Sequence, residues 1–504
     1  MAGRRLALLA LLISAASLVA AGSSSSKYMR FDLLRREPAS LAELWQMDRE
    51  RMAFIAARRG RGRRATETWT EKAAAPAPAP ASGDDSAFAM PLSSGAYTGT
   101  GQYFVRFRVG TPAQPFLLVA DTGSDLTWVK CSRPVAAAAD PYGLWSGPAA
   151  APSPAPLGRA FRPEESRTWR PISCASDTCV ESLPFSLAAC PTPGSPCAYD
   201  YRYKDGSAAR GTVGTDSATI ALSGPPSSPT KAKLRGVVLG CTTSYTGDSF
   251  LASDGVLSLG YSNISFASRA ASRFGGRFSY CLVDHLAPRN ETSYLTFGPN
   301  PAVSPPPTPR PKPAACHSSS APPAAAVPGS RTTPLLLDHR THPFYAVTLN
   351  GVSVDGELLK IPRLVWDVER GGGTILDSGT SLTVLATPAY KAVTKALSAR
   401  LAGVPRVAMD PFDYCYNWTS PDTGEDLVDV PVPKLALHFA GASRMEPPTK
   451  SYVIDAAPGV KCIGLQEGEW PGVSVIGNIL QQEHLWEFDL NNRRLRFQRS
   501  RCTH

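Results

Sequence analysis

The feature that most constrains this chain is a short pattern that occurs twice. Residues 118–128 are Leu-Val-Ala-Asp-Thr-Gly-Ser-Asp-Leu-Thr-Trp, and residues 374–384 are Thr-Ile-Leu-Asp-Ser-Gly-Thr-Ser-Leu-Thr-Val. Each copy passes from apolar residues into Asp, a small hydroxyl residue, Gly and a second hydroxyl residue. One Asp-Thr-Gly is ordinary turn chemistry. Two copies that each follow an apolar strand indicate a duplicated unit.

The repeat is longer than the motif itself. Residues 102–110 and 344–352 are rich in aromatic and β-branched residues, which predicts a strand ahead of each copy, and residues 116–120 and 373–376 predict the short strands that lead into the two Asp residues. Units of about 180 residues are too long for a solenoid, whose repeats span ~20–50 residues. Pro388 to Leu401 is the best helical segment of a chain that is otherwise predicted to be mainly β.

Two Asp residues in matching turns point to acid–base chemistry. Two carboxylates that share a small space do not easily ionise together, so one keeps its proton and the pair supplies an acid and a base. The hydroxyls of the two motifs are suited to hold the carboxylates, and each Gly lets the backbone approach closely. Ser378 is not expected to be a nucleophile because the chain has no Gly-x-Ser-x-Gly. Asp125 is expected to be a solvated polar residue near this site.

The N-terminal region has the pattern of an exported precursor. Arg4 and Arg5 precede an apolar run, residues 6–21, that is shorter than the ~20 residues a membrane span needs. We expect a signal peptide over residues 1–26 and no membrane anchor. A charged, helix-like segment and a Pro/Ala linker follow, which predicts a propeptide. Two further low-complexity stretches, residues 134–158 and 301–330, are expected to be surface loops.

Charge and cysteine content limit the classes of partner and of bound group that we expect for this chain. The formal net charge is +10 among 504 residues, but residues 27–72 alone hold 12 Lys/Arg against 7 Asp/Glu, so we expect no nucleic-acid partner. Eleven cysteines without a Cys-x-x-Cys pair suit the disulfides of an exported protein. His339 and His342 lack further ligand candidates, so no metal is expected. Glycosylation sequons stand at Asn263, Asn290 and Asn417.

The paired motifs resemble those of the pepsin-like aspartic proteases, over roughly residues 99–502. Residues 203–207, Tyr-Lys-Asp-Gly-Ser, resemble the flap of that family, and residues 254–257 and 475–477 resemble the segments that back its two Asp loops. The spacing from Cys174 to Cys197 and residues 278–282 are most similar to the plant nepenthesin-like subgroup. The resemblance implies a mostly β, bilobal fold with two duplicated β lobes and a cleft between them.

The same resemblance assigns roles to individual residues. Asp121 and Asp377 are the expected catalytic pair, and Tyr203 and Trp128 belong to the flap and cleft. Disulfides are expected between Cys281 and Cys502 and between Cys415 and Cys462, while six N-terminal cysteines allow 15 pairings and stay open. The residues expected to support the carboxylates are Thr122, Gly123, Ser124, Ser378, Gly379 and Thr380.

Three departures from the family pattern stand near the first copy. Ser258 occupies a position that is usually Gly, which we expect to perturb the backing of the Asp121 loop. Lys204 replaces a common Gly in the flap, and two cysteines usual after Cys131 are absent. None of these changes removes a carboxylate.

The resulting expectation is a secreted aspartic endopeptidase made as a zymogen, active at acidic pH, without cofactor, acting on polypeptides as a monomer in the apoplast or the vacuole. The alternative is a catalytically silent inhibitor or binding protein of the same fold. The expected organisation is a signal peptide (1–26), a propeptide and linker (27–90), an N-terminal lobe (91–300), a Pro/Ala-rich insertion between the lobes (301–333) and a C-terminal lobe (334–504).

Overall fold

The structure is a computed structural model that describes residues 88–94, 101–132, 159–183, 190–202, 208–221, 231–246, 250, 252–288, 291, 293–298, 330–338, 340–419 and 430–502. The expected signal peptide and nearly all of the expected propeptide lie outside these residues. So do Tyr203, Lys204, Asn290, Cys316 and His339. Within the described ranges, no helix has both the length and the apolar character needed to cross a membrane.

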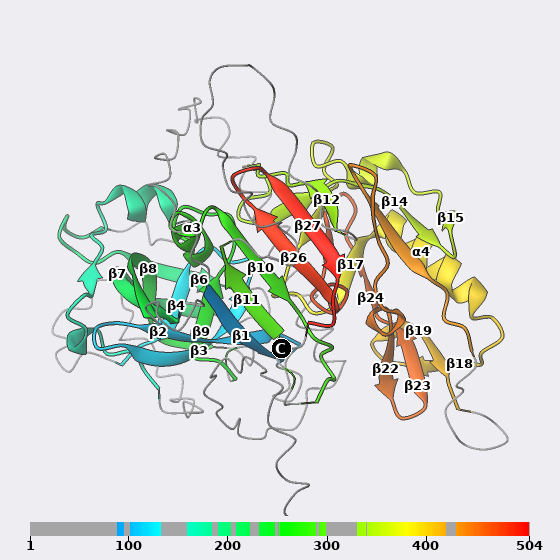
Figure 1. Cartoon of the computed structure of the whole chain (residues 1–504), viewed down its shortest axis with the longest axis horizontal. Coiled ribbons are helices and arrows are strands. Elements are labelled where there is room, and N and C mark those ends of the chain that lie inside the picture. Colours follow the sequence, from blue (N-terminus) through cyan, green and yellow to red (C-terminus); the bar gives the residue numbers. More distant parts are fainter. Residues whose placement is uncertain are drawn as a thin grey trace, which may run out of the picture. The chain divides into compact units, whose positions relative to one another are not determined.

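The first lobe is built on one large mixed sheet, in which most neighbouring strands are antiparallel (Figure 1). Its strand order is β12-β27-β26-β10-β11-β1-β2-β3-β9-β4-β8-β7-β5, and β6 pairs with β7. The strands from this half of the chain are β1 (Phe88–Ser94), β2 (Tyr103–Val109), β3 (Gln114–Asp121), β4 (Thr127–Lys130), β5 (Arg170–Pro171), β6 (Ala198–Arg202), β7 (Ala208–Ala221), β8 (Lys231–Thr246), β9 (Gly255–Ser258), β10 (Arg277–Cys281) and β11 (Ser293–Phe297).

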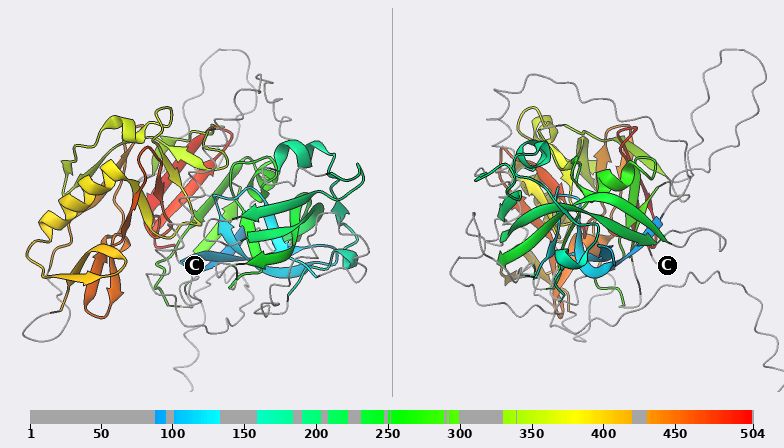
Figure 2. Two further views of the ribbon diagram at one scale, coloured as in Figure 1. Left: turned by 180° about the vertical axis from the view of Figure 1, so that it is seen from behind. Right: turned by 90° about the vertical axis from the view of Figure 1, so that its left-hand side faces the viewer.

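The second lobe contains three smaller sheets, and helix α4 (Thr387–Arg400) packs against β17 and β24 of the first of them (Figure 2). That sheet holds β13 (Tyr345–Val347), β16 (Thr374–Leu376), β25 (Ser474–Ile476), β17 (Thr383–Ala386) and β24 (Leu465–Gly468). The other two hold β15 (Glu357–Leu358), β14 (Leu349–Val354), β20 (Leu435–Phe439) and β21 (Ser443–Met445), and β18 (Arg406–Met409), β19 (Phe412–Asn417), β23 (Val460–Ile463) and β22 (Val453–Ala457).

Helices are few among the described residues. Besides α4 there is α3 (Phe266–Ala271), whose first turn is capped by the Ser265 side chain. The short helices are η2 (Pro163–Glu165), η3 (Thr178–Ser182), η5 (Arg363–Trp366) and η6 (Thr449–Ser451). The predicted helix from Pro388 to Leu401 is confirmed by α4, where Pro388 occupies the first turn and needs no hydrogen-bond partner for its nitrogen.

The predicted strands are confirmed with one change. β2 and β3 occupy the ranges expected before Asp121, and β16 the range expected before Asp377. The predicted strand 344–352 is wrong as a single element, because it divides into β13 and β14, which pair in different sheets. The mostly β, two-lobed fold expected from the sequence is confirmed.

The two Asp motifs occupy the same topological position in their lobes. β3 runs parallel to β9, which lies antiparallel to β4, so β9 is inserted between the strands on either side of the Asp121 loop (Figure 1). β25 is inserted in the same way between β16 and β17, around Asp377. Residues 254–257 and 475–477, which resemble the family's backing segments, therefore lie behind the two loops.

The chain's last strands return to the sheet of the first lobe. β26 (His484–Asp489) pairs with β10, and β27 (Arg494–Arg499) pairs with β26 and with β12 (Arg331–Pro334). The rings of Phe278 and Phe488 stack across this seam, with centroids 4.6 Å apart. β12 begins inside the range that the sequence assigned to the insertion, and β26 and β27 come from the range assigned to the C-terminal lobe. Strands from outside the range expected for the N-terminal lobe therefore complete the sheet of that lobe.

In the described part of the chain, which holds ten of the eleven cysteines, five disulfides are formed. Cys281 is bonded to Cys502 and Cys415 to Cys462, which are the pairs implied by the resemblance. The six cysteines that the sequence left open form the pairs Cys131–Cys241, Cys174–Cys190 and Cys179–Cys197. The first of these joins the end of β4 to β8.

Ser258 ends β9 without disturbing its register, because it pairs with Asp121 as the duplicated topology requires. Its hydroxyl lies 2.7 Å from the Thr127 hydroxyl and accepts a hydrogen bond of 3.1 Å from the Phe266 amide at the start of α3. At the matching position, Gly477, a Cβ would lie 2.4 Å from the Leu382 carbonyl oxygen, so that lobe requires Gly. The perturbation expected from Ser258 is therefore not seen in the pairing.

We predict that Ser258→Gly destabilises the fold by about 1–3 kcal/mol, since it removes a buried hydroxyl and leaves the Phe266 amide without its acceptor. Urea unfolding followed by fluorescence measures the change. Ser272→Ala, at the exposed end of α3, is the control and is expected to stay within about 0.5 kcal/mol of the wild type. Equal stability of Ser258→Gly and the wild type would contradict the structural role of this hydroxyl.

Candidate active site

The two Asp side chains end buried strands and are themselves buried. Asp121 is the last residue of β3 and Asp377 follows β16 directly. Asp121 is 2% exposed and Asp377 is 0% exposed. Buried carboxylates need hydrogen-bond donors in place of water. The Asp-hydroxyl-Gly-hydroxyl pattern supplies them locally.

Each carboxylate accepts hydrogen bonds from the same two kinds of donor, the amide of the motif's Gly and the hydroxyl of the next residue. The Gly123 amide donates to Asp121 Oδ1 over 2.9 Å, and the Ser124 hydroxyl donates to Asp121 Oδ2. In the second lobe the Gly379 amide donates to Asp377 Oδ1 over 3.0 Å, and the Thr380 hydroxyl to Asp377 Oδ2 over 2.6 Å. These turns form because an Asp side chain readily accepts from the amide two residues later. Both carboxylates are therefore fixed in matching orientations.

The hydroxyl residues between Asp and Gly join the two loops. The Thr122 amide donates to Ser378 Oγ over 3.0 Å, and the Ser378 amide donates to Thr122 Oγ1 over 2.9 Å. The Ser378 hydroxyl in turn donates to the Ala120 carbonyl oxygen, 2.9 Å away. Because each of these residues directly follows its Asp, this crossed pair brings the two Asp residues to the same place.

A chain of hydrogen bonds backs the Asp377 loop, and the sequence did not reveal it. The Ile476 carbonyl oxygen accepts from the Asp377 amide at 3.2 Å and from the Gln481 side-chain amide at 2.7 Å. The Tyr280 hydroxyl, from β10 of the first lobe, donates to the Gln481 side-chain oxygen. Burial, and secondarily the nearby charge of Asp377, raises the pKa of Tyr280, so its hydroxyl stays protonated as a donor.

Asn478 provides a second backing contact. Its side-chain amide donates to the carbonyl oxygens of Ser378 and Gly101, at 3.0 and 2.8 Å. Asn478 and Gln481 come just after residues 475–477, the segment expected behind the Asp377 loop, and this position was the signal available in the sequence. Polar residues that follow a buried strand directly are candidates for such contacts.

Trp128 and Asp125 are both buried in the first lobe. Trp128 lies in β4 and packs edge-to-face on Phe250, with ring centroids 4.9 Å apart. Asp125 was expected to be solvated, which is wrong: it is buried and accepts a hydrogen bond of 3.0 Å from the Tyr201 hydroxyl. Tyr203 lies outside the described residues, so its place relative to Trp128 stays a prediction.

The remaining expected sites lie away from the Asp loops in sequence and differ in exposure. Asn263 is exposed, and Asn417 is partly buried, with its side-chain oxygen accepting from the Thr419 amide at 3.0 Å. In the part of the chain that the structure describes, no group of three or more His, Cys, Asp or Glu residues is arranged to hold a metal.

Comparison with known proteins places this geometry in a family. Residues 103–299 match the family model described as "Xylanase inhibitor N-terminal", and residues 344–499 match "Xylanase inhibitor C-terminal". Aspartyl protease family protein 2 of Arabidopsis thaliana is 32% identical over 423 residues, which cover 82% of this chain and 74% of that protein. Aspartic proteinase nepenthesin-2 of Nepenthes gracilis is 27% identical over 414 residues, 82% of this chain and 80% of that protein.

Solved structures agree on the fold. The crystal structure of edgp superposes with a TM-score of 0.59 at 21% identity, covering 82% of this chain and 95% of the other. Basic 7S globulin from soybean gives a TM-score of 0.54 at 19% identity, with coverages of 82% and 94%. These similarities show the fold, and the sequence matches show that the chain belongs to the plant family of pepsin-like aspartic proteases.

Proposed function

We propose that this protein is an aspartic endopeptidase that hydrolyses peptide bonds of polypeptide substrates at acidic pH. The observation that carries the proposal is the crossed hydrogen bonding of Thr122 and Ser378, which sets Asp121 and Asp377 side by side in equivalent cradles. In this mechanism one carboxylate takes a proton from water, and the water attacks the scissile carbonyl. The other carboxyl group, still protonated, donates to the carbonyl oxygen. No side-chain nucleophile is needed.

The proposal also covers the export, processing and location of the chain. Residues 1–26 direct export, residues 27–90 act as a propeptide, and the mature enzyme is a glycosylated monomer of the apoplast or the vacuole. Its lobes are residues 91–300 and 334–504, separated by the 301–333 insertion, with the shared strands described above. Tyr203 closes over the substrate near Trp128. The support for these points is the sequence pattern and the family resemblance.

A second candidate is a protein of this fold that binds other proteins without cleaving them. It is favoured by the descriptions of the two matching family models, which name xylanase inhibitors. Both Asp residues and all four hydroxyl partners are present, which favours the enzyme. The two candidates differ in whether purified protein releases new peptides or slows a xylanase.

Replacing either Asp by Asn is expected to lower proteolysis by about a thousandfold or more, since the amide neither accepts the water's proton nor donates as a carboxyl group does. The measurement is the digestion of an acid-unfolded protein mixture by propeptide-free protein, with products identified by mass spectrometry and a pepstatin-type inhibitor as a further arm. Asp177→Asn, on the exposed surface, is the matched control. If the wild type released no peptides but inhibited a xylanase, the binding protein would replace the enzyme as the proposed function.

Gln481 is expected to act as a positioning residue for Asp377. Gln481→Met keeps the side-chain volume but removes the bonds to Tyr280 and to the Ile476 carbonyl oxygen, so we expect kcat to fall about tenfold, equivalent to ~1.4 kcal/mol, with little change in KM. Steady-state kinetics of peptide cleavage measures both constants. Gln498→Met on β27 is the control. A variant that loses stability while keeping its kcat and its pH profile would assign Gln481 a structural role alone.

An acidic working pH affects two buried histidines, His285 and His484. Burial lowers the pKa of both, partly opposed by Asp284 at His285 and by the Gln482 carbonyl oxygen at His484. Because each pKa is lower in the folded protein, the unfolded chain takes up these protons first as pH falls. Their contribution to stability is therefore complete above the unfolded pKa, about 6.5, and is lost progressively below it.

We expect His484→Gln to lessen the drop in Tm between pH 7 and pH 5, because the substituted side chain does not titrate. Thermal unfolding at the two pH values measures the drop in the variant and in the wild type. His342→Gln, at an exposed position, is the control. An equal drop in wild type and His484→Gln would show that His484 contributes nothing to acid sensitivity.

A further inference from the structure

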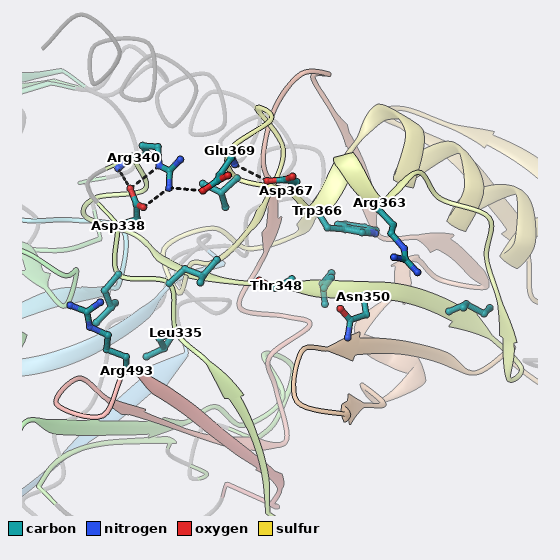
Figure 3. Close-up of a pocket in the computed structure, with 15 residues that line it drawn as sticks. Leu335, Asp338, Arg340, Thr348, Asn350, Arg363, Trp366, Asp367, Glu369 and Arg493 are labelled. Atoms are coloured by element: carbon teal, nitrogen blue, oxygen red, sulfur yellow. Dashed lines mark hydrogen bonds and ion pairs between the residues drawn. The ribbon is translucent and has the colours of Figure 1, made fainter. Parts of the chain in front are cut away.

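The second lobe contains a cavity of about 880 Å³ that none of the residues of the Asp121 and Asp377 loops lines (Figure 3). Three of its charged side chains are bound to one another: Arg340 forms two hydrogen bonds with Asp338, of 2.9 and 2.6 Å, and lies 3.6 Å from Glu369. This cavity therefore offers the two carboxylates no contact. A further buried carboxylate, within the first Asp motif itself, lies in the first lobe.

Asp125 is a third buried carboxylate within the two motifs, and the proposed reaction does not use it. It is 0% exposed and directly follows Ser124, whose hydroxyl donates to Asp121 Oδ2. The other copy of the motif has Ser381 at this position, so the duplication does not require a carboxylate there. A buried carboxylate needs hydrogen-bond donors in place of water. A donor for Asp125 must therefore come from elsewhere in the fold.

Tyr201 of β6 supplies such a donor. Its hydroxyl donates to Asp125 Oδ1 over 3.0 Å. Its ring is buried in an apolar cluster that also holds Val119 of β3 and Trp128 of β4. The hairpin of β6 and β7 is therefore packed against the strands that lead into and out of the Asp121 loop. The position of the donor is set by this hairpin and not by the loop itself.

Ser124 is the residue through which Asp125 affects Asp121. The Ser124 hydroxyl donates to Asp121 Oδ2, and the Ser124 carbonyl oxygen accepts from the Gly260 amide at 3.0 Å. If the Tyr201 hydroxyl is removed, the Asp125 carboxylate has one donor fewer in a buried site, and a movement toward water replaces it. Because Ser124 and Asp125 are consecutive, this movement draws the Ser124 hydroxyl away from Asp121.

We propose that Tyr201 is a positioning residue for Asp121 in the proposed reaction. Its hydroxyl keeps the Asp125 carboxylate in its buried place. Ser124, the preceding residue, then keeps its hydroxyl on Asp121 Oδ2. The effect on catalysis rests on the proposed function, whereas the link between the hairpin and the loop is a property of the fold. The second copy of the motif, with Ser381 at the matching position, has no carboxylate to hold there.

The first test is Tyr201→Phe, which keeps the ring and removes the hydroxyl. We expect kcat for peptide cleavage to fall about tenfold with little change in KM, because the orientation of Asp121 changes and the surface that binds substrate does not. Steady-state kinetics measures both constants.

Tyr199→Phe is the matched control. Tyr199 lies two residues earlier on the same face of β6, is also fully buried, and forms a hydrogen bond of 2.5 Å with the Thr242 hydroxyl of β8, outside the Asp motifs. It loses a bond of the same kind, so we expect it to lower stability as Tyr201→Phe does while kcat stays within about twofold of the wild type. Equal kcat values in the two variants would overturn the proposal.

The double variant Tyr201→Phe/Asp125→Asn tests the route through Asp125. An uncharged amide tolerates a missing donor at lower cost than a carboxylate does. We therefore expect the double variant to be faster than Tyr201→Phe, by about threefold, whereas losses at independent positions multiply. A double variant that is no faster than Tyr201→Phe would contradict a role of Tyr201 that depends on Asp125.

Hydrogen exchange tests the link between the hairpin and the loop without a substrate. In Tyr201→Phe, peptides that contain residues 122–126 should exchange about fivefold faster than in the wild type, and in Tyr199→Phe they should exchange at the wild-type rate. Unchanged exchange of these peptides in Tyr201→Phe would refute the proposal even in an active protease. If the wild type released no peptides, the proposed function would fail, and the exchange rates would still decide whether Tyr201 holds the loop.

Discussion

The rest of the structure depends on the crossed hydrogen bonds between Thr122 and Ser378. Both residues are buried, so their amides and hydroxyls have no water to bind and need protein partners. Each finds them in the other copy of the motif, 256 residues away. Without the partner loop, each would leave polar groups unsatisfied, at about 1–3 kcal/mol apiece. Neither loop is therefore complete alone, which explains why the hydroxyl residue is kept in both copies.

Much of this arrangement could be predicted from the sequence, because its determinants are local or repeated. A carboxylate, an amide two residues later and a hydroxyl three residues later define a turn whatever surrounds it. The duplication then indicated that the two turns meet. The burial of Asp125 could not be predicted, since it depends on Tyr201, which comes from a strand far along the chain. The three first-lobe disulfides and the pairing of β26 with β10 could not be predicted either, because they also depend on which distant segments of the chain meet.

The family includes proteins named as proteases and domain models named for inhibitors, so the fold alone does not decide the function. What differs among such proteins is the set of side chains placed on the common frame. In this chain both Asp residues keep their amide and hydroxyl donors, so the common frame carries the groups that the proposed reaction needs.

The most informative feature of the site is the difference between the residues that lie behind its two Asp loops. The two carboxylates have equivalent donors, yet the proposed reaction needs one to act as base and the other as acid, which requires unequal surroundings. The donors to the carboxylates are too similar to supply the difference. The backing supplies it: Ser258 connects the first loop to Thr127 and α3, whereas Gly477 allows a close approach in the second. Only the Asp377 loop rests on the Gln481–Tyr280 chain, and Tyr280 comes from the opposite lobe. The shared sheet thus couples the first lobe to the second carboxylate, and the asymmetry follows from residues that the duplication does not repeat.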